Sequence, residues 1–199
     1  MHFGRPRMSD IPTHHRIYGT TIDFLSGETV VDTDDERLRQ ELARFLVEDK
    51  NYEKTDLAAR LTIETLFAGQ FVVSTIDFVL TVQGKKFMII RYGPGSLVTR
   101  ERPAIAAARV LEPAYQIPRA VVTNARDAEL LDTRSGKVLA TGLACLPDRS
   151  QAIQLVDSLT FAPITDEKCR ERELRILNAF DVEVCCVGGP CALPGAPEG

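Results

Sequence analysis

Residues 72–82 read VVSTIDFVLTV and residues 85–95 read KKFMIIRYGPG, and these two stretches decide the fold. Both are rich in β-branched, aromatic and other apolar residues, which is typical of buried strands. The Gln83-Gly84 turn signal between them predicts a hairpin. Asp77 stands inside the first strand, where a buried charge is costly unless it is paired. It therefore needs a partner, either a metal ion or an arginine.

The segment before the hairpin adds a helix and a third strand. Residues 32–50, DTDDERLRQELARFLVEDK, place Leu38, Leu42, Phe45 and Leu46 at helical spacing behind a capping box of Thr33 and Glu36. Residues 57–67 alternate loosely as a strand and end at an Ala-Gly turn. The sequence therefore predicts an amphipathic helix that leads into a three-stranded meander.

The segment after the hairpin completes a small mixed α/β domain. Thr99 is the expected cap of a helix containing AIAAARVLE (residues 104–112), and residues 119–123 form a short buried strand. Residues 129–141 predict a second hairpin, and two C-terminal helices follow, capped by Ser150 and by Thr165 or Asp166. The side chains expected in the core are Leu38, Leu42, Phe45, Ile76, Phe78, Ile89, Ile105 and Val121.

Composition narrows the class of protein. The 199 residues are 44% hydrophobic and 26% charged, which suits one soluble domain. No run of 18 uncharged apolar residues predicts a membrane span, and residues 1–16 lack the apolar core of a secretory signal. A net charge of −4 gives no general attraction to nucleic acid, so DNA binding would need a local basic patch.

The cysteines and histidines give little sign of a metal centre. Cys169, Cys185, Cys186 and Cys191 are enough for zinc by number, but they lack a C-x-x-C pair. The odd total of five cysteines favours a reduced, cytoplasmic protein over a disulfide scaffold. His14 and His15 fall in the N-terminal segment, so a histidine-based catalytic triad is not expected.

Several longer strings carry a family resemblance. They are FLSGETVVDTDDERLRQELARFLVED (residues 24–49), STIDFVL (74–80), GPGSLVTRER (93–102) with AAARVLE (106–112), and IPRAVVTNARDAELLDTRSGKVL (117–139). Together, over residues 20–145, they resemble the N-terminal nuclease domain of type I restriction enzyme R subunits, in a small stand-alone form. That family lies in the PD-(D/E)xK nuclease superfamily. The resemblance implies a restriction-endonuclease-like core: helix, three-stranded meander, helix, strand.

The resemblance also implies a metal site of which only part is present. In active members an Asp and a Glu bind magnesium and a Lys orients the attacking water. Asp77 matches the Asp, but Ile90 and Tyr92 stand where the Glu and Lys belong. Sliding the alignment by one residue puts Arg91 and Gly93 there instead. Since neither register supplies a second carboxylate, magnesium binding is expected to be weak or absent.

Two further residues are candidates for this site. Glu36 resembles the acid on the first helix that can lean toward the metal, although it also fits the capping box. Arg91 is a candidate catalytic residue in place of the Lys, or it pairs with Asp77 across adjacent strands. No G-x-x-x-x-G-K-[ST] motif is present, so an ATP-driven motor is not expected in this chain.

Arginines following the third strand supply a candidate DNA-binding face. Its members are Arg100, Arg102, Arg109 and Arg119. They either line a phosphate-binding surface or belong to a solvated surface shared with Glu101 and Glu112.

Three hypotheses follow. The first is a restriction-endonuclease-like domain that binds DNA or a protein partner through a degenerate nuclease site. The second is an active magnesium-dependent DNA endonuclease with a non-standard site, and the third is a structural oligomeric module without DNA binding. The expected divisions are a flexible arm (residues 1–19), the domain itself (20–145), a helical extension (146–182) and a Gly/Pro/Cys-rich tail (183–199).

Overall fold

The computed structural model describes residues 17–185, which form a mixed α/β fold built on a six-stranded sheet. Its strands are β3 (Leu57–Phe67), β4 (Gln70–Val82), β5 (Lys85–Tyr92), β6 (Arg119–Thr123), β7 (Ala128–Asp132) and β8 (Val138–Thr141). They lie in sequence order across the sheet, and every neighbouring pair is antiparallel except β5 and β6. The parallel pair arises because a helix crosses over between these two strands.

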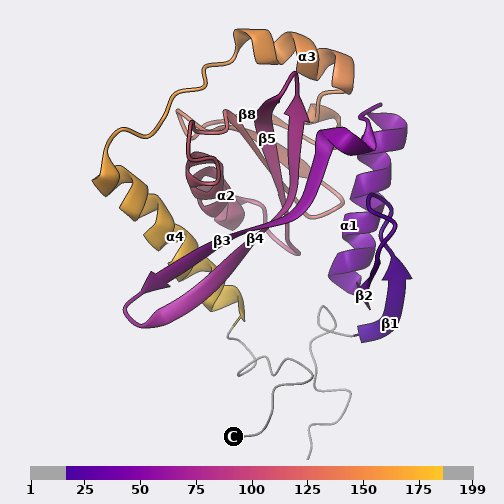
Figure 1. Cartoon of the computed structure of the whole chain (residues 1–199), viewed down its shortest axis with the longest axis horizontal. Coiled ribbons are helices and arrows are strands. Elements are labelled where there is room, and N and C mark those ends of the chain that lie inside the picture. Colours follow the sequence, from indigo (N-terminus) through magenta and orange to yellow (C-terminus); the bar gives the residue numbers. More distant parts are fainter. Residues whose placement is uncertain (1–16, 186–199) are drawn as a thin grey trace, which may run out of the picture.

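Four α-helices surround this sheet in the described residues (Figure 1). They are α1 (Asp34–Arg44), α2 (Val98–Val110), α3 (Arg149–Ser158) and α4 (Glu167–Cys185). A π-helical turn, η2 (Phe45–Asp49), continues α1, and two 3-10 turns are η3 (Lys54–Asp56) and η4 (Leu143–Cys145). A separate two-stranded hairpin of β1 (Ile17–Ile22) and β2 (Thr29–Thr33) lies beside α1. None of these helices is long and apolar enough to cross a membrane.

The order of elements agrees with the prediction from the sequence, with four local corrections. The β1–β2 hairpin was not expected, and Ile17–Gly19 of the expected flexible arm begin β1. Thr99 does not cap α2, which already begins at Val98. Asp148, not Ser150, caps α3 by accepting a hydrogen bond from the Gln151 amide. Finally, α4 continues to Cys185, beyond the expected end of the helical extension at residue 182.

Two apolar clusters fill the space on the two faces of the sheet. One cluster joins the sheet to α2 and α4, and the other joins it to α1 and α3. Five of the expected core side chains are buried, namely Ile76, Phe78, Ile89, Ile105 and Val121. The other three, Leu38, Leu42 and Phe45, are only half-buried. The buried face of α1 instead carries Glu36, Gln40 and Ala43. Glu36 and Gln40 can be buried there because they form hydrogen bonds with polar side chains beneath the helix.

The β3–β4 hairpin extends well beyond the neighbouring strands and runs alongside α4 (Figure 1). Asn178 of α4 donates hydrogen bonds to the Thr65 hydroxyl and the Gln70 carbonyl oxygen, which fixes the helix on one face of the hairpin. Leu66 and Phe71 are directly paired across the strands, and both are exposed on the outer part of the hairpin.

The predictions about the cysteines and histidines lie largely outside the described residues. His14 and His15 belong to residues 1–16, and Cys186, Cys191 and most of the expected tail belong to residues 186–199. Cys169 is a free thiol in the first turn of α4, within 3.1 Å of a carboxylate oxygen of Asp166.

Candidate functional site

Asp77 lies on β4 beneath α1, and its carboxylate is bound by an arginine. Arg39 of α1 donates from Nε and Nη2 to Asp77 Oδ1, at 3.0 and 2.8 Å. The backbone amide of Tyr92, at the end of β5, donates to Asp77 Oδ2 at 2.7 Å. The Asp77 side chain is only 7% exposed, so these donors replace the water it lost on burial. Of the two partners expected for Asp77, a metal ion or an arginine, the structure therefore contains the arginine.

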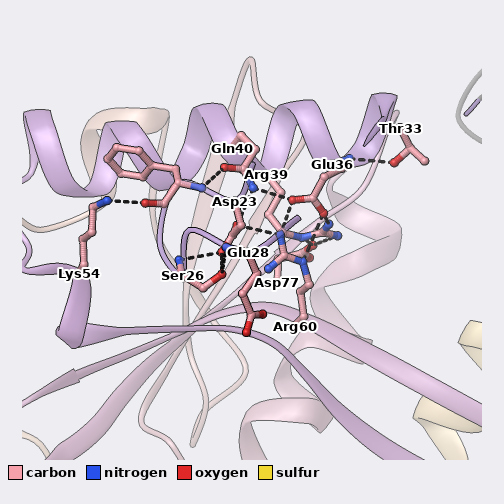
Figure 2. A network of polar contacts seen from close by, with 11 residues as sticks. Asp23, Ser26, Glu28, Thr33, Glu36, Arg39, Gln40, Lys54, Arg60 and Asp77 are labelled. Atoms are coloured by element: carbon pink, nitrogen blue, oxygen red, sulfur yellow. Dashed lines mark hydrogen bonds and ion pairs between the residues drawn. The ribbon is translucent and has the colours of Figure 1, made fainter. Parts of the chain in front are cut away.

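Arg39 joins Asp77 to the second candidate, Glu36. Its Nη1 donates to Glu36 Oε2 at 2.5 Å, three residues back along the same helix. Thr33 caps α1 as expected, since its hydroxyl accepts from the Glu36 amide at 3.1 Å. The Glu36 carboxylate, however, points under the helix toward the sheet (Figure 2). Glu36 therefore contributes its backbone to the cap and its side chain to a buried ion network.

A second arginine, Arg60, enters this network from β3. The β3–β4 register pairs Ala59 with Phe78 and Leu61 with Ile76, which puts Arg60 opposite Asp77. Arg60 has a φ of 58°, a left-handed conformation that is uncommon for any residue other than glycine. Non-glycine residues held in this conformation occur often at functional sites.

The contacts of Arg60 explain what holds it there. Its guanidinium donates to Glu36 Oε1 and to Asp23 Oδ1, the latter at 2.9 Å. Gln40 of α1 donates to the same two oxygens, each at 2.6 Å, and accepts from the Phe24 amide. The chain between β1 and β2 is thereby tied to α1 and β3 through one polar cluster (Figure 2).

The arginines keep these carboxyl groups ionised despite their burial. Burial by itself raises the pKa of Glu36, but hydrogen bonds from Arg60 and Gln40 and the two guanidinium charges outweigh it, so the pKa lies below its usual value. Burial opposes ionisation of Asp23 in the same way, yet hydrogen bonds from Arg60, Gln40 and Ser26 hold its pKa well below the usual range. Both groups are therefore carboxylates at neutral pH.

The cluster does not suit magnesium. Magnesium needs carboxylate oxygens and several retained waters in an octahedral arrangement. Here both oxygens of Asp77 already accept hydrogen bonds, and guanidinium nitrogens occupy the space between Asp77 and Glu36. Within residues 17–185, no group of three or more histidine, cysteine, aspartate or glutamate side chains is arranged to hold a metal ion. The positive charge at this position comes from the protein itself.

Arg91 does not reach Asp77, so the expected Arg91–Asp77 pair is wrong. The Arg91 guanidinium donates to Asp181 of α4 at 2.9 Å. Alternation along β5 explains this outcome, because Ile90 and Arg91 project to opposite faces of the sheet. Ile90 belongs to the apolar cluster under α1, whereas Arg91 meets α4.

The four arginines expected to bind DNA are all in contact with protein acceptors. Arg102 and Arg109 both pair with Glu173, a carboxylate on α4 that is 2% exposed. Arg119 pairs with Asp132 on the neighbouring strand. Arg100 lies over Gly93 and donates to the Pro94 carbonyl oxygen at 2.7 Å. Each of these arginines therefore already has a protein acceptor: Arg102 and Arg109 share Glu173, Arg119 has Asp132, and Arg100 has a backbone carbonyl oxygen.

Sequence reasoning missed Arg39, Arg60, Asp23 and Gln40. A signal existed for the first two. Glu36 and Arg39 are three residues apart, a spacing that brings oppositely charged side chains together on a helix. The Ala68-Gly69 turn fixes the hairpin register and so predicts Arg60 opposite Asp77. Asp23 and Gln40 left no such pattern.

Comparison with known proteins gives one match. A family model described as "Type I restriction enzyme R protein N terminus" matches residues 34–147, which include Glu36, Arg39, Arg60 and Asp77. No curated protein and no solved structure matches the chain. The match ends before α3, so α3 and α4 lie outside it.

Proposed function

The chain belongs to the type I restriction enzyme R protein N-terminus family, and we propose that it is a restriction-endonuclease-like domain that binds DNA without cleaving it. The observation that carries this proposal is the occupation of the Asp77–Glu36 site by Arg39. A guanidinium there neutralises the carboxylate charge that would otherwise attract a divalent cation. It cannot lower the pKa of a bound water as a metal ion does.

The arrangement of elements supports the restriction-endonuclease-like part of the proposal. Helix α1 is followed by the meander β3–β4–β5, then by α2 and by β6, which is parallel to β5. Asp77 lies on the middle strand of that meander, beneath α1. These are the positions that the family resemblance implies for a nuclease core and its metal-binding Asp.

The DNA-binding part rests on the more accessible arginines. The Arg102 side chain is 42% exposed even though it contacts Glu173, and Arg100, also in the first turns of α2, is partly exposed. Because Glu173 already neutralises part of this charge, we expect weak binding with a steep dependence on salt.

Cleavage and binding can be tested with one preparation. We expect no cleavage of supercoiled plasmid above background in magnesium or manganese, and weak anisotropy changes with a fluorescent duplex at low salt. Arg102→Ala should reduce the duplex signal, while Arg37→Ala, an exposed arginine on α1, should leave it nearly unchanged. Robust cleavage that disappears in Asp77→Ala would instead favour the active endonuclease.

One observation favours a second function, that of a structural oligomeric module. The outer face of the β3–β4 hairpin carries Leu66, Phe71 and Val73, which are 65%, 63% and 46% exposed. Exposed apolar side chains grouped in this way often mark contacts between proteins. Sedimentation of the wild-type chain and of Phe71→Ser would distinguish the two functions. A concentration-dependent oligomer that Phe71→Ser dissociates, without any DNA binding, would support the structural module.

A further inference from the structure

A pocket opens beside the Asp77 cluster, where α1 faces the ends of the two parallel strands. Its volume is about 140 Å³. The residues that line it are Leu38, Glu41, Leu42, Phe45, Tyr92, Thr123, Ala125 and Leu143. Tyr92 and Thr123 are the last residues of β5 and β6 and are paired in the parallel register. In open α/β sheets, the crevice outside the carboxyl ends of parallel strands is a usual place for ligands.

The pocket explains why three expected core residues are only half-buried. Leu38, Leu42 and Phe45 have helical spacing on one side of α1 and η2, yet no other element covers them fully. Leu42 and Phe45 pack in part against the apolar cluster under α1, and the remaining surface of the three side chains forms an apolar wall of the pocket. When a ligand covers such an apolar surface and removes it from water, the free energy of the system falls, which favours binding.

Two backbone irregularities border the same pocket. The first is η2, where the helix widens into a π-turn that begins at Phe45. The second is Ala125 in the β6–β7 loop, which has a φ of 68° although it is not glycine. π-Turns and strained non-glycine residues both concentrate at functional sites. Their joint presence distinguishes this pocket from an ordinary surface depression.

The lining also indicates the chemistry of a ligand. A dry apolar cavity of about 150 Å³ is enough to hold benzene, so this pocket suits one ring-sized apolar group. Glu41 is the charged member of the lining, and it makes no ion pair with any residue in the described part of the chain. The Thr123 hydroxyl is already bonded to the Asp127 carbonyl oxygen and the Ala125 amide. An exposed carboxylate that has no ion-pair partner among residues 17–185 and lies beside an apolar wall is complementary to an apolar cation.

We infer that this pocket binds a ring-sized apolar group that carries a cationic amine, with Glu41 as its counter-ion. Such a group is present in a free arylalkylamine and in a protein segment that has an aromatic residue next to a lysine. The inference does not depend on DNA binding or on the absence of cleavage.

Amide chemical-shift titration of the full chain tests the chemistry directly. The probes are phenethylamine, the neutral 3-phenylpropanamide and the anionic 3-phenylpropanoate. We expect phenethylamine to bind most tightly and to shift the amides of Leu38, Tyr92, Ala125 and Leu143. Equal binding of the anion, or shifts scattered away from the pocket, would overturn the inference.

Three variants show whether the site is the one described. Glu41→Gln should weaken phenethylamine binding by about threefold to fivefold, the range of a solvent-exposed ion pair, and leave 3-phenylpropanamide unchanged. Glu48→Gln, an exposed acid of η2 outside the pocket, is the matched control and should change neither. Leu42→Trp should fill the pocket and abolish both, with circular dichroism confirming that it is folded. An unchanged amine affinity in Glu41→Gln would contradict the role of Glu41.

Two more probes identify the source of the ligand. Tighter binding of N-acetyl-Phe-Lys-amide than of phenethylamine would support the inference and assign the ligand to a protein segment. Weaker binding of this dipeptide, with phenethylamine still bound, would support it and assign the ligand to a free amine. A single-stranded oligonucleotide that shifts the same amides, with an affinity that Glu41→Gln does not lower, would overturn the inference in favour of a nucleobase.

Discussion

Replacing Arg39 by alanine should destabilise the protein far more than replacing Arg37, although both arginines lie on α1. Arg39 is 15% exposed and donates three hydrogen bonds to two carboxylates that are each 7% exposed. Arg37 is 50% exposed and pairs with Asp32 near the surface. Removing one partner of a buried ion pair costs about 3–5 kcal/mol, whereas an exposed pair contributes about 0–1 kcal/mol.

The lower end of the first range applies to Arg39→Ala. Glu36 keeps Arg60 as a partner, and Asp77 keeps the Tyr92 amide, so only the Asp77 charge loses its counter-ion completely. We therefore expect a loss of about 3 kcal/mol, a large part of a typical stability of about 5–15 kcal/mol.

Urea unfolding followed by circular dichroism measures this difference. With an m-value of about 2–3 kcal/mol/M, the midpoint should fall by about 1–1.5 M in Arg39→Ala and by less than about 0.5 M in Arg37→Ala. Adding Asp77→Asn to Arg39→Ala should restore part of the loss, because the unpaired charge is then removed. Equal midpoints for the two single variants would refute the argument that Asp77 depends on Arg39.

Three further outcomes are expected. Calorimetry should detect magnesium binding only in the millimolar range or weaker, because the carboxylate oxygens already accept hydrogen bonds; micromolar affinity that vanishes in Asp77→Asn would contradict this. Because the folded-state pKa values of Asp23 and Glu36 are lowered, their stabilisation is complete above the unfolded pKa of about 4 and is lost as the pH falls below it. Urea midpoints between pH 6 and 3 should therefore fall less steeply in Glu36→Gln than in the wild type, and parallel curves would count against the cluster. Glu173→Gln should weaken two ion pairs between α4 and α2 and tighten duplex binding severalfold at low salt, measured by anisotropy; unchanged binding would show that these arginines do not contact DNA.

The sheet was predictable from the sequence because its strands are buried and its turns are marked. Residues 119–123 were expected as a strand and form β6 with those bounds. The β1–β2 hairpin was not predicted from the sequence because nearly every side chain of β1 is exposed. A strand that buries neither face leaves no alternation of apolar and polar residues to detect.

The candidate site was predictable only in part, for a different reason. Asp77 was identified because a buried acid must have a partner, but the sequence pattern did not choose between a metal ion and an arginine. For α1 and η2 the helical period was correct, but of the apolar residues in that pattern only Leu46 is fully buried. Periodicity assumes that apolar residues are the buried ones, whereas here Arg39 and Arg60 make it favourable to bury Glu36. The pocket beside α1 then leaves Leu38, Leu42 and Phe45 partly open to water.

The contacts of α4 have a consequence for any anionic ligand of this domain. Glu173 and Asp181 of this helix bind Arg91, Arg102 and Arg109. Residues 159–166 tether α4 to the rest of the chain, so its carboxylates compete with an incoming phosphate at an effective concentration on the order of millimolar. An anionic ligand must therefore displace the α4 carboxylates from these arginines before it can bind them. Affinity measured on a shortened chain without α4 would overstate what the whole chain can bind.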